Sequence, residues 1–479
     1  MTTSAVKPIT RVYIGGEWID TREHDVVRLP YDGMPVGEVP HAGTELVDRA
    51  VSAARHAFQT TRELANFERA DLLLRVADLI RRDQAEFAHL ICSETGKPIR
   101  EAKVEASRSL ETLAAAAHEA RQLHGEVVPM DFSATGKGRM AITVREPLGV
   151  IGCITPFNVP LNLALHKVAP ALAAGNTVVH KPATKTPLSA LRLARTMEEA
   201  GVPKGAYNVI TGSGAEIGMA LAEHSGVAML TFTGSPQVGR TIKSRAGFKK
   251  VTLELGNNSA VIIEPGSDLK TAVTRSVQGA FSHSGQVCIS VQRIFVHRSI
   301  VSDFIDQLTA ATNALKIGHP YEETTDISSL IDDQEAIRIE QWIKEAVDAG
   351  AKLITGGKRT RATVSPAILT GVPSQCHISC QEAFGPVVAV YEYDELDAAI
   401  TQANATPYGL QAGIFTPDVQ RAFQAARKLE VGGVIINDIP MFRADHMPYG
   451  GVKESGTGRE GPKYAIEEMT EPKLICWKV

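Results

Sequence analysis

Apolar residues in the N-terminal part of the chain recur at helical spacing. Over residues 45–58 they return every three to four positions, which predicts a helix with one face turned inward. A second helical stretch begins near Phe67 and ends near Gly96 and Pro98, because glycine and proline commonly end helices. The N-terminal part is therefore expected to be mainly helical.

From residue 149 to residue 255 the pattern changes to short apolar runs that alternate with helical stretches. Such alternation is typical of a parallel sheet with crossover helices, which is the outline of a nucleotide-binding architecture. The predicted strands are 150–155, 177–180, 207–210, 228–231 and 251–255, and the predicted helices between them include 161–174 and 188–200.

A second alternating region follows residue 259 and predicts a second α/β lobe. Its expected strands are 260–263, 293–296, 387–391 and 433–437. Residues 127–144 and 473–479 alternate apolar and polar positions outside both sheets. This pattern suits an edge ribbon that pairs with another subunit.

Composition narrows the possible classes of protein. A chain of 479 residues with 44% hydrophobic and 22% charged residues can bury two or three packed lobes. Its net charge is −4 and its lysines and arginines are dispersed, so no nucleic-acid partner is expected. There is no apolar run of about 18 residues, and Met1–Thr10 lacks a signal pattern, so we expect a cytoplasmic protein without membrane contact.

The six cysteines lie at irregular positions and are expected to be reduced thiols. Cys376 and Cys380 flank His377, but no second ligand pair stands at zinc-like spacing. No metal is expected.

Several short segments carry chemistry, and together they resemble the aldehyde dehydrogenase superfamily over nearly the whole chain. They are Thr155-Pro156-Phe157-Asn158-Val159-Pro160, Lys181-Pro182, Phe232-Thr233-Gly234-Ser235, Leu253-Glu254-Leu255-Gly256, Gly285-Gln286-Val287-Cys288, Glu382-Ala383-Phe384-Gly385-Pro386 and residues 447–456. The resemblance implies an α/β fold with a Rossmann-like NAD(P)-binding domain (residues 1–125 and 145–255). It also implies a second α/β catalytic domain (256–460) and a small β oligomerisation ribbon (126–144 and 461–479) in a homodimer or homotetramer.

Cys288 is the expected nucleophile. It follows small residues in a loop-like stretch, where a substrate carbonyl can approach the sulfur. An isolated cysteine is more often buried and inert, but the neighbouring motif favours the reactive interpretation. The attacking form is the thiolate, so a lowered pKa or a nearby base is required.

Glu254 and Asn158 complete the expected catalytic group. Glu254 ends a strand among apolar neighbours, which should raise the pKa of its carboxyl and suit a general base, although a salt bridge is the alternative. Asn158 lies between a strand and a helix. It is either a helix cap or, with the backbone N–H of Cys288, an oxyanion hole. The resemblance assigns the base to Glu254 and implies a thiohemiacetal, hydride transfer and hydrolysis of a thioester.

The cofactor is expected to be NADP or NAD. Gly212, Gly214 and Gly218 do not form the usual dinucleotide fingerprint and could be a turn that feeds a helix, whereas Gly234-Ser235 opens a helix whose N–H groups can face a pyrophosphate. The expected cofactor residues are Thr155, Pro156, Phe157, Lys181, Thr184, Gly214, Gly218, Phe232, Thr233, Gly234, Ser235, Leu255, Glu382 and Phe384.

One position bears on the choice of cofactor. NAD-preferring relatives often carry a carboxylate three residues after the lysine, whereas this chain has Thr184 followed by Lys185. Nothing there repels a 2′-phosphate, which favours NADP or dual use.

The substrate is expected to be a short hydroxy-aldehyde or an anionic semialdehyde. The segment 255–259 and Cys288-Ile289-Ser290 resemble the lactaldehyde and non-phosphorylating glyceraldehyde-3-phosphate dehydrogenase branch. Arg108 and Arg443 match positions where relatives bind phosphate or phosphonate groups, although each could instead form a salt bridge. Val287 replaces a further arginine of the phosphate-binding relatives, which argues against a phosphorylated substrate.

Three alternatives stay open from sequence. In a CoA-acylating dehydrogenase, CoA rather than water accepts the acyl group, but Glu254 argues for hydrolysis. A cysteine hydrolase would pair Cys288 with His283, but leaves the nucleotide motifs unexplained. A non-catalytic protein on the same fold would have no need of all three chemical residues.

Overall fold

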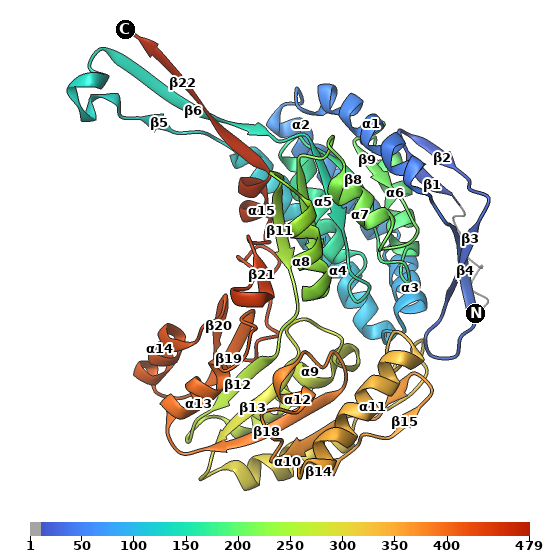
Figure 1. Ribbon diagram of the computed structural model, residues 1–479, viewed down its shortest axis with the longest axis vertical. Coiled ribbons are helices and arrows are strands. Elements are labelled where there is room, and N and C mark those ends of the chain that lie inside the picture. The colour runs from blue at the N-terminus through green and yellow to red at the C-terminus, as the bar shows by residue number, and fades with distance from the viewer. Residues whose placement is uncertain (1–10) are drawn as a thin grey trace.

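The computed structural model describes residues 11–479 and contains two sheet-centred lobes and a projecting ribbon (Figure 1). The segment Met1–Thr10, in which we expected no signal sequence, lies outside the described residues. Within residues 11–479, no helix is both long enough and apolar enough to cross a membrane.

The first lobe is built on an eight-stranded sheet with a parallel centre and antiparallel edges. Its order is β2 (Glu17–Ile19), β1 (Val12–Ile14), β9 (Tyr207–Val209), β8 (Thr177–Lys181), β7 (Val150–Ile154), β10 (Met229–Thr233), β11 (Lys250–Glu254) and β21 (Gly456–Thr457). The chain runs from β7 outward to β9 and then returns to the other side of β7 at β10. The strand order therefore reverses between β7 and β10, where open α/β sheets bind ligands at the carboxyl ends of their strands.

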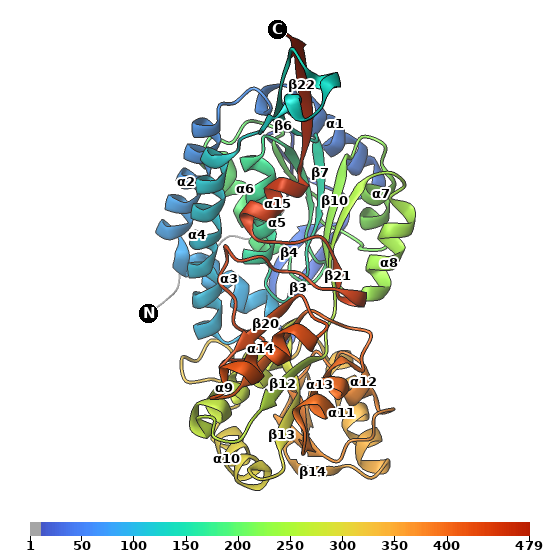
Figure 2. The same ribbon diagram turned by 90° about the vertical axis from the view of Figure 1, so that its left-hand side faces the viewer.

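Helices cover both faces of this sheet (Figure 2). Successive residues of a strand point to opposite faces, and Ile151 and Cys153 pack on one side while Val150 and Ile154 pack on the other. The helices are α1 (Thr44–Thr61), α2 (Asn66–Arg82), α3 (Gln84–Thr95), α4 (Ile99–Gln122), α5 (Asn162–Ala173), α6 (Leu188–Glu199), α7 (Ile217–Glu223) and α8 (Pro236–Arg245). The expected first helix and sheet strands are confirmed, with shifts of a few residues at their ends.

The helical stretch expected from Phe67 to Gly96 is wrong as a single element. It is divided at Asp83, whose backbone leaves the helical region and ends α2 where α3 begins. The Asp83 carboxylate is held there by Arg82 and Arg192. The predicted end is confirmed, because Gly96 adopts a left-handed conformation that closes α3.

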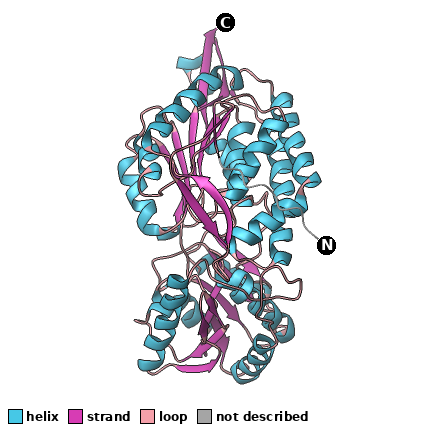
Figure 3. Cartoon of the chain, turned by 90° about the vertical axis from the view of Figure 1, so that its right-hand side faces the viewer, coloured by secondary structure: helices cyan, strands magenta, loops and turns pink. Residues whose placement is uncertain are grey.

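The second lobe contains a seven-stranded sheet, parallel except for one edge strand. Its order is β14 (Lys352–Thr355), β17 (Ala367–Thr370), β18 (Val387–Tyr393), β13 (Val291–His297), β12 (Ser259–Ile263), β19 (Gln411–Phe415) and β20 (Gly433–Ile436). Its helices, which flank the sheet in Figure 3, are α9 (Leu269–Phe281), α10 (Val301–Asn313), α11 (Asp333–Asp348), α12 (His377–Cys380), α13 (Leu396–Asn404) and α14 (Val419–Lys428). The second α/β lobe is thereby confirmed.

The ribbon is a three-stranded antiparallel sheet of β22 (Thr470–Lys478), β6 (Arg139–Pro147) and β5 (Val127–Val128). The two segments that the sequence placed outside both lobes pair with each other, and α15 (Pro462–Glu468) leads from the first lobe into the last strand. Smaller two-stranded sheets join β3 (His24–Arg28) to β4 (Pro35–Pro40) and β15 (Arg359–Thr360) to β16 (Thr363–Val364). The residue boundaries of the domains stay a prediction.

The packing between helices and the first sheet yields a stability prediction. Phe87 of α3 is fully buried, so Phe87→Ala should lower the free energy of unfolding by about 3–5 kcal/mol through lost burial and a cavity. Phe67→Ala is the matched control, because that ring is 60% exposed. Denaturant melts of the two variants measure the difference, and equal midpoints would contradict this packing.

Candidate active site

The loop that presents Cys288 has an unusual backbone. His283, Ser284 and Gly285 all have positive φ values, of 49°, 54° and 76°. A Cβ on residue 285 would lie 2.1 Å from the carbonyl oxygen of Gly385, so only glycine fits. Gly285 therefore allows two loops to approach each other closely, whereas the sequence had suggested that it makes room for the substrate.

Gln286 anchors the same loop to the segment before α11. Its side-chain oxygen accepts a hydrogen bond from the backbone N–H of Ile331 at 2.9 Å. Its backbone carbonyl accepts a hydrogen bond from the side-chain amide of Asn158 at 2.7 Å. The loop is thus fixed on both sides just before the cysteine.

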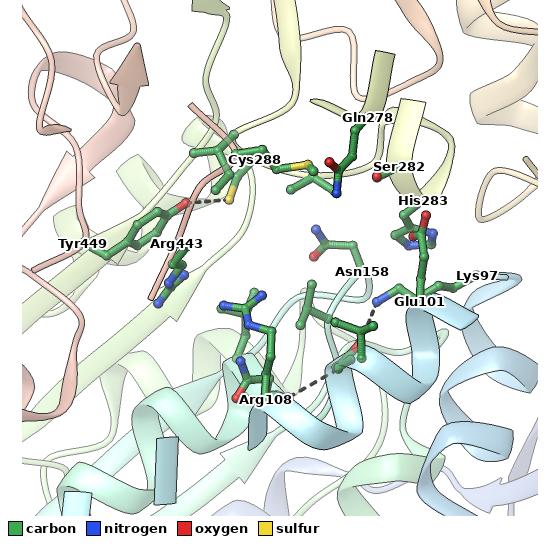
Figure 4. A pocket seen from close by; sticks show the side chains of 18 residues that line it. Lys97, Glu101, Arg108, Asn158, Gln278, Ser282, His283, Cys288, Arg443 and Tyr449 are labelled. Atoms are coloured by element: carbon green, nitrogen blue, oxygen red, sulfur yellow. Dashed lines mark hydrogen bonds and ion pairs between the residues drawn. The ribbon is translucent and has the colours of Figure 1, made fainter. Parts of the chain in front are cut away.

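The Cys288 sulfur is half-buried and lines two cavities rather than lying in packed core. Its Sγ atom lies 2.8 Å from the hydroxyl oxygen of Tyr449 (Figure 4). Burial raises the pKa of the thiol to about 11, while the hydrogen bond with Tyr449 and the charge of Arg443 oppose the rise. The free thiol is therefore protonated at neutral pH and needs a base to attack.

Glu254 is the last residue of β11, and its carboxylate is buried without a hydrogen-bond partner among the described residues. Burial, and next the charge of Glu460, raise the pKa of this carboxyl well above its usual value, as the sequence predicted. The salt bridge considered as an alternative is absent among residues 11–479. A Cβ at residue 450 would lie 2.8 Å from Glu254 Oε1, so Gly450 provides the space for the carboxylate.

Asn158 is buried in the loop between β7 and α5. It does not cap that helix, whose N-cap is Leu161. A side-chain amide has two N–H donors, and one is used on the carbonyl of Gln286. The bond fixes the side chain beside the sulfur, and the second N–H is available to an oxygen in the cavity.

Two cavities meet at Cys288 and Asn158, which line both of them. The first, of about 310 Å³, lies between α4 and the cysteine loop and contains both predicted arginines, Arg108 and Arg443 (Figure 4). The second, of about 440 Å³, lies at the carboxyl ends of β10 and β11. A small molecule in the first cavity and an extended one in the second would touch at the sulfur.

Most of the expected cofactor residues line the second cavity. They are Pro156, Phe157, Thr233, Gly234, Ser235, Leu255, Glu382 and Phe384. Ser235 caps α8 by accepting from the N–H of Val238, so the start of this helix faces the cavity. The N-terminal N–H groups and the positive end of a helix favour a pyrophosphate, so the residues present fit a dinucleotide.

Glu382 lies at the other end of this cavity. It accepts a hydrogen bond from the backbone N–H of Asn257 at 2.9 Å, and burial raises the pKa of its carboxyl to about 7. A Cβ on residue 256 would lie 2.6 Å from Glu382 Oε2, so Gly256 leaves room for the carboxylate in its present position. The T-shaped pair of Phe157 and Phe384 lines the same cavity.

The remaining predicted cofactor residues lie behind or beside the cavity. Lys181 donates to the carbonyl of Pro182 and to Thr184 Oγ1, and burial lowers the pKa of its ammonium to about 8. Gly214 lies beside Lys181, and Thr184 lines an adjoining cavity with Lys185. Thr155, Phe232 and Gly218 are buried within or behind the sheet and do not line these cavities.

Both predicted substrate arginines form ion pairs and also line the first cavity. Arg108 makes two hydrogen bonds to Asp445, at 2.7 and 3.1 Å. Arg443 lies 3.1 Å from Glu460 Oε2, and its guanidinium carbon lies 3.7 Å from the centre of the Tyr449 ring. Each arginine therefore forms a salt bridge and also lines the cavity, so the two interpretations are compatible.

Sequence reasoning missed three features of the site. Tyr449 was quoted only as part of a motif, although it contacts the sulfur. The buried pair of Lys167 and Glu460, 2.5 Å apart, had no sequence signal beyond two distant charges in apolar surroundings. The ion pair of Lys185 and Asp332 crosses between the lobes and lines both the second and the adjoining cavity.

The comparison with known families fits this geometry: the sequence profile of the aldehyde dehydrogenase family matches residues 18–475. The chain belongs to the aldehyde dehydrogenase family. It is 51% identical over 464 residues to the 3-sulfolactaldehyde dehydrogenase of Priestia aryabhattai, covering 97% of each chain. It is 40% identical to the lactaldehyde dehydrogenase of Methanocaldococcus jannaschii, covering 97% of this chain and 99% of that protein.

Solved aldehyde dehydrogenase structures share the whole fold. Aldehyde dehydrogenase 21 of Physcomitrella patens, in complex with succinate, superposes with a TM-score of 0.96 at 38% identity over 99% of both chains. The glyceraldehyde-3-phosphate dehydrogenase GapN of Methanocaldococcus jannaschii, complexed with NADP, gives 0.92 at 40% identity over 96% of this chain and 100% of that chain. This aldehyde dehydrogenase is therefore an oxidoreductase that oxidises aldehydes with NAD(P), as the sequence predicted.

The environment of Glu254 predicts a pH dependence. Its raised pKa means that the proton-accepting form increases as pH rises and is lost as pH falls, so hydrolysis of a thioester should accelerate with pH. Glu254→Gln should remove this dependence and slow thioester release about 100-fold or more, with little effect on cofactor binding. Stopped-flow measurement should then give a slower burst of reduced cofactor, because the Cys288 thiol also loses its base, followed by still slower turnover.

The matched control removes the sulfur instead of the base. Cys288→Ala should give neither burst nor turnover, because no covalent intermediate can form. Normal turnover by this variant would exclude Cys288 as the nucleophile.

Proposed function

We propose that this aldehyde dehydrogenase oxidises a three-carbon 2-hydroxyaldehyde with a terminal sulfonate, of the 3-sulfolactaldehyde type, to the carboxylic acid. The 51% identity to a 3-sulfolactaldehyde dehydrogenase over nearly the full length supports this substrate class. The observation that carries the proposal is that two guanidinium groups, of Arg108 and Arg443, share one cavity with the Cys288 sulfur.

The size and charge of the cavity support a short anionic substrate. Its volume of about 310 Å³ suits a small molecule, and it also receives the buried ammonium of Lys97, which is paired with Glu105. Arginine presents planar, paired donors that bind the oxygens of sulfonate, carboxylate or phosphate. Val287 adds an apolar wall where the phosphate-binding relatives carry another arginine, which supports a sulfonate or carboxylate over a phosphate.

The pairing of each arginine leaves donors available to a substrate. Arg108 is 35% exposed and contacts Asp445 through two of its nitrogens. Asp445 also accepts from Asn162 and His166, so its charge is shared among several donors. A guanidinium has five N–H donors, which leaves others for the anionic group of a substrate.

In the proposed reaction, the Cys288 sulfur adds to the aldehyde carbon and the oxyanion of the thiohemiacetal accepts from the Asn158 amide and the Cys288 backbone N–H. The hydride that next leaves the thiohemiacetal carbon, which gives the thioester, would be accepted by NAD(P) when it is bound. Glu254 takes a proton from the thiol, releases it to solvent, and later takes another from the water that cleaves the thioester. Burial has made the Glu254 carboxylate, which accepts the proton in both transfers, more basic.

We also propose that NADP is accepted, alone or beside NAD. Thr184 adds no negative charge next to the two cavities, and the ammonium of Lys185 lines them as the partner of Asp332. The residues proposed to hold the dinucleotide are those of the second cavity, with Lys181 and Thr184 at its adenosine end.

The ribbon is proposed to contact a second copy of the chain in a homodimer or homotetramer. Apolar side chains remain exposed along it, including Val127, Met140, Leu474 and Trp477. Exposed apolar patches of this kind commonly mark protein interfaces.

A panel of short aldehydes tests the substrate class. Arg108→Ala and Arg443→Ala should each raise KM for 3-sulfolactaldehyde about 10- to 100-fold, because each removes a hydrogen bond to a charged group, and should change KM for lactaldehyde little. Reduced cofactor is monitored for hydroxylated, carboxylated, phosphorylated and sulfonated aldehydes, with and without CoA. Equal rises in KM for neutral and anionic aldehydes would discredit the anion site, and an acyl-CoA product would favour the CoA-acylating alternative.

The cofactor proposal is tested at residue 184. Thr184→Glu places a carboxylate where a 2′-phosphate would lie and should raise KM for NADP at least about tenfold relative to NAD. Thr184→Gln is the matched control without the charge. An unchanged ratio of the two KM values would place the 2′-phosphate elsewhere.

The ribbon proposal is tested by light scattering. Leu474→Asp should lower the molar mass in solution, because it introduces a charge into the exposed apolar strand, whereas Lys473→Asp on the same strand should not. An unchanged mass for Leu474→Asp would remove this strand from the interface.

A further inference from the structure

Tyr449 is the one hydroxyl bound to the candidate nucleophile within residues 11–479. Its oxygen lies 2.8 Å from Cys288 Sγ, and its ring is buried in a small apolar cluster with Ile289 and Leu410. No other hydrogen bond of this hydroxyl is found among the described residues. The side chain is therefore aimed at the sulfur, and packing holds it there.

Arg443 lies against the face of the same ring. Its guanidinium carbon is 3.7 Å from the ring centre, and it is held in place by Glu460, which is itself paired with Lys167. A cation over an aromatic face is attracted by the electron density of the ring. The guanidinium thus reinforces the phenol as a hydrogen-bond donor.

Two carboxyls approach the sulfur from other elements. Glu254 at the end of β11 and Glu382 before β18 are carboxyls whose negative forms raise the pKa of the thiol. Tyr449 and Arg443 lower it. Burial opposes the thiolate, so a donor at the sulfur is needed most when the thiolate forms.

We propose that Tyr449 is a catalytic residue whose phenolic O–H donates to the Cys288 thiolate and stabilises it until it attacks, with Arg443 stacked on the ring as its support. The proton of the thiol leaves to Glu254, and the tyrosine keeps its own proton throughout. When the sulfur bonds to carbon it loses its negative charge and becomes a weak acceptor. The stabilisation is therefore greatest before addition.

The expected effect of removing the hydroxyl follows from thiol chemistry. A hydrogen bond to a charged acceptor changes the thiolate population about tenfold or more. The more basic thiolate of the variant is intrinsically more reactive. For each tenfold loss of thiolate population, this higher reactivity raises the alkylation rate about threefold and so offsets part of the loss. Tyr449→Phe should therefore lower the alkylation rate of Cys288 about threefold at each pH below the pKa of the thiol. The increase of this rate with pH should occur at higher pH than in the unmodified enzyme.

The experiment measures iodoacetamide labelling of Cys288 against pH, by mass spectrometry of its peptide in the intact, aldehyde-free enzyme. A small free thiol labelled in parallel reports the reagent's own pH dependence. Tyr321→Phe is the matched control, because it removes a similar hydroxyl that bonds to Ser93 far from the sulfur. Arg443→Gln should act in the same direction as Tyr449→Phe, and Arg443→Lys should restore part of the rate.

An unchanged Cys288 profile in Tyr449→Phe would overturn the proposal, as would an equal change in Tyr321→Phe. The inference rests on the proposed role of Cys288, but labelling needs no substrate. Failure of the sulfonate assignment, seen in the aldehyde panel, therefore leaves this result intact. Loss of the nucleophile's role would be seen separately in Cys288→Ala.

Discussion

A short backbone segment that connects the two sheets determines how the site is assembled. Strand β11 ends at Glu254, and β12 of the second lobe begins at Ser259, so only residues 255–258 separate the sheets. The carboxyl end of the first parallel sheet is thereby held against the second lobe. Cys288 and Glu382 of the second lobe line the second cavity together with Glu254, which ends β11 of the first lobe.

Burial at this junction sets the chemical character of the site. Glu254, Glu382 and Cys288 all have raised pKa values with burial as the first cause. Glu460 goes the other way: burial opposes its ionisation, but the charges of Lys167 and Arg443 hold the pKa of its carboxyl low. One carboxyl is kept ready to accept a proton while its neighbour is kept charged, which is how nearby acids acquire separate roles.

Sequence reasoning predicted the strands and those candidate site residues that lie in contiguous motifs. The strands around Val150–Ile154 and Met229–Thr233 follow from apolar runs, and Cys288, Glu254 and Asn158 follow from the resemblance. It did not find contacts between distant segments. Tyr449 lies 161 positions from Cys288, and Asp445 lies 337 positions from Arg108, so no local pattern links either pair. The division between α2 and α3 was missed because Asp83 ends a helix through side-chain partners rather than as glycine or proline.

Residues after about position 440 complete the first sheet and the candidate active site, whose other parts come from much earlier in the chain. Strand β21 closes the edge of the first sheet beside β11, and Arg443, Tyr449 and Glu460 all come from the last tenth of the sequence. Contacts between such distant segments form slowly, because a long loop must close first. During synthesis the N-terminal lobe emerges with an unpaired sheet edge, and that edge stays open until residues Gly456–Thr457 of β21 have left the ribosome. The nascent protein therefore exposes the edge of β11 to aggregation until β21 can pair with it.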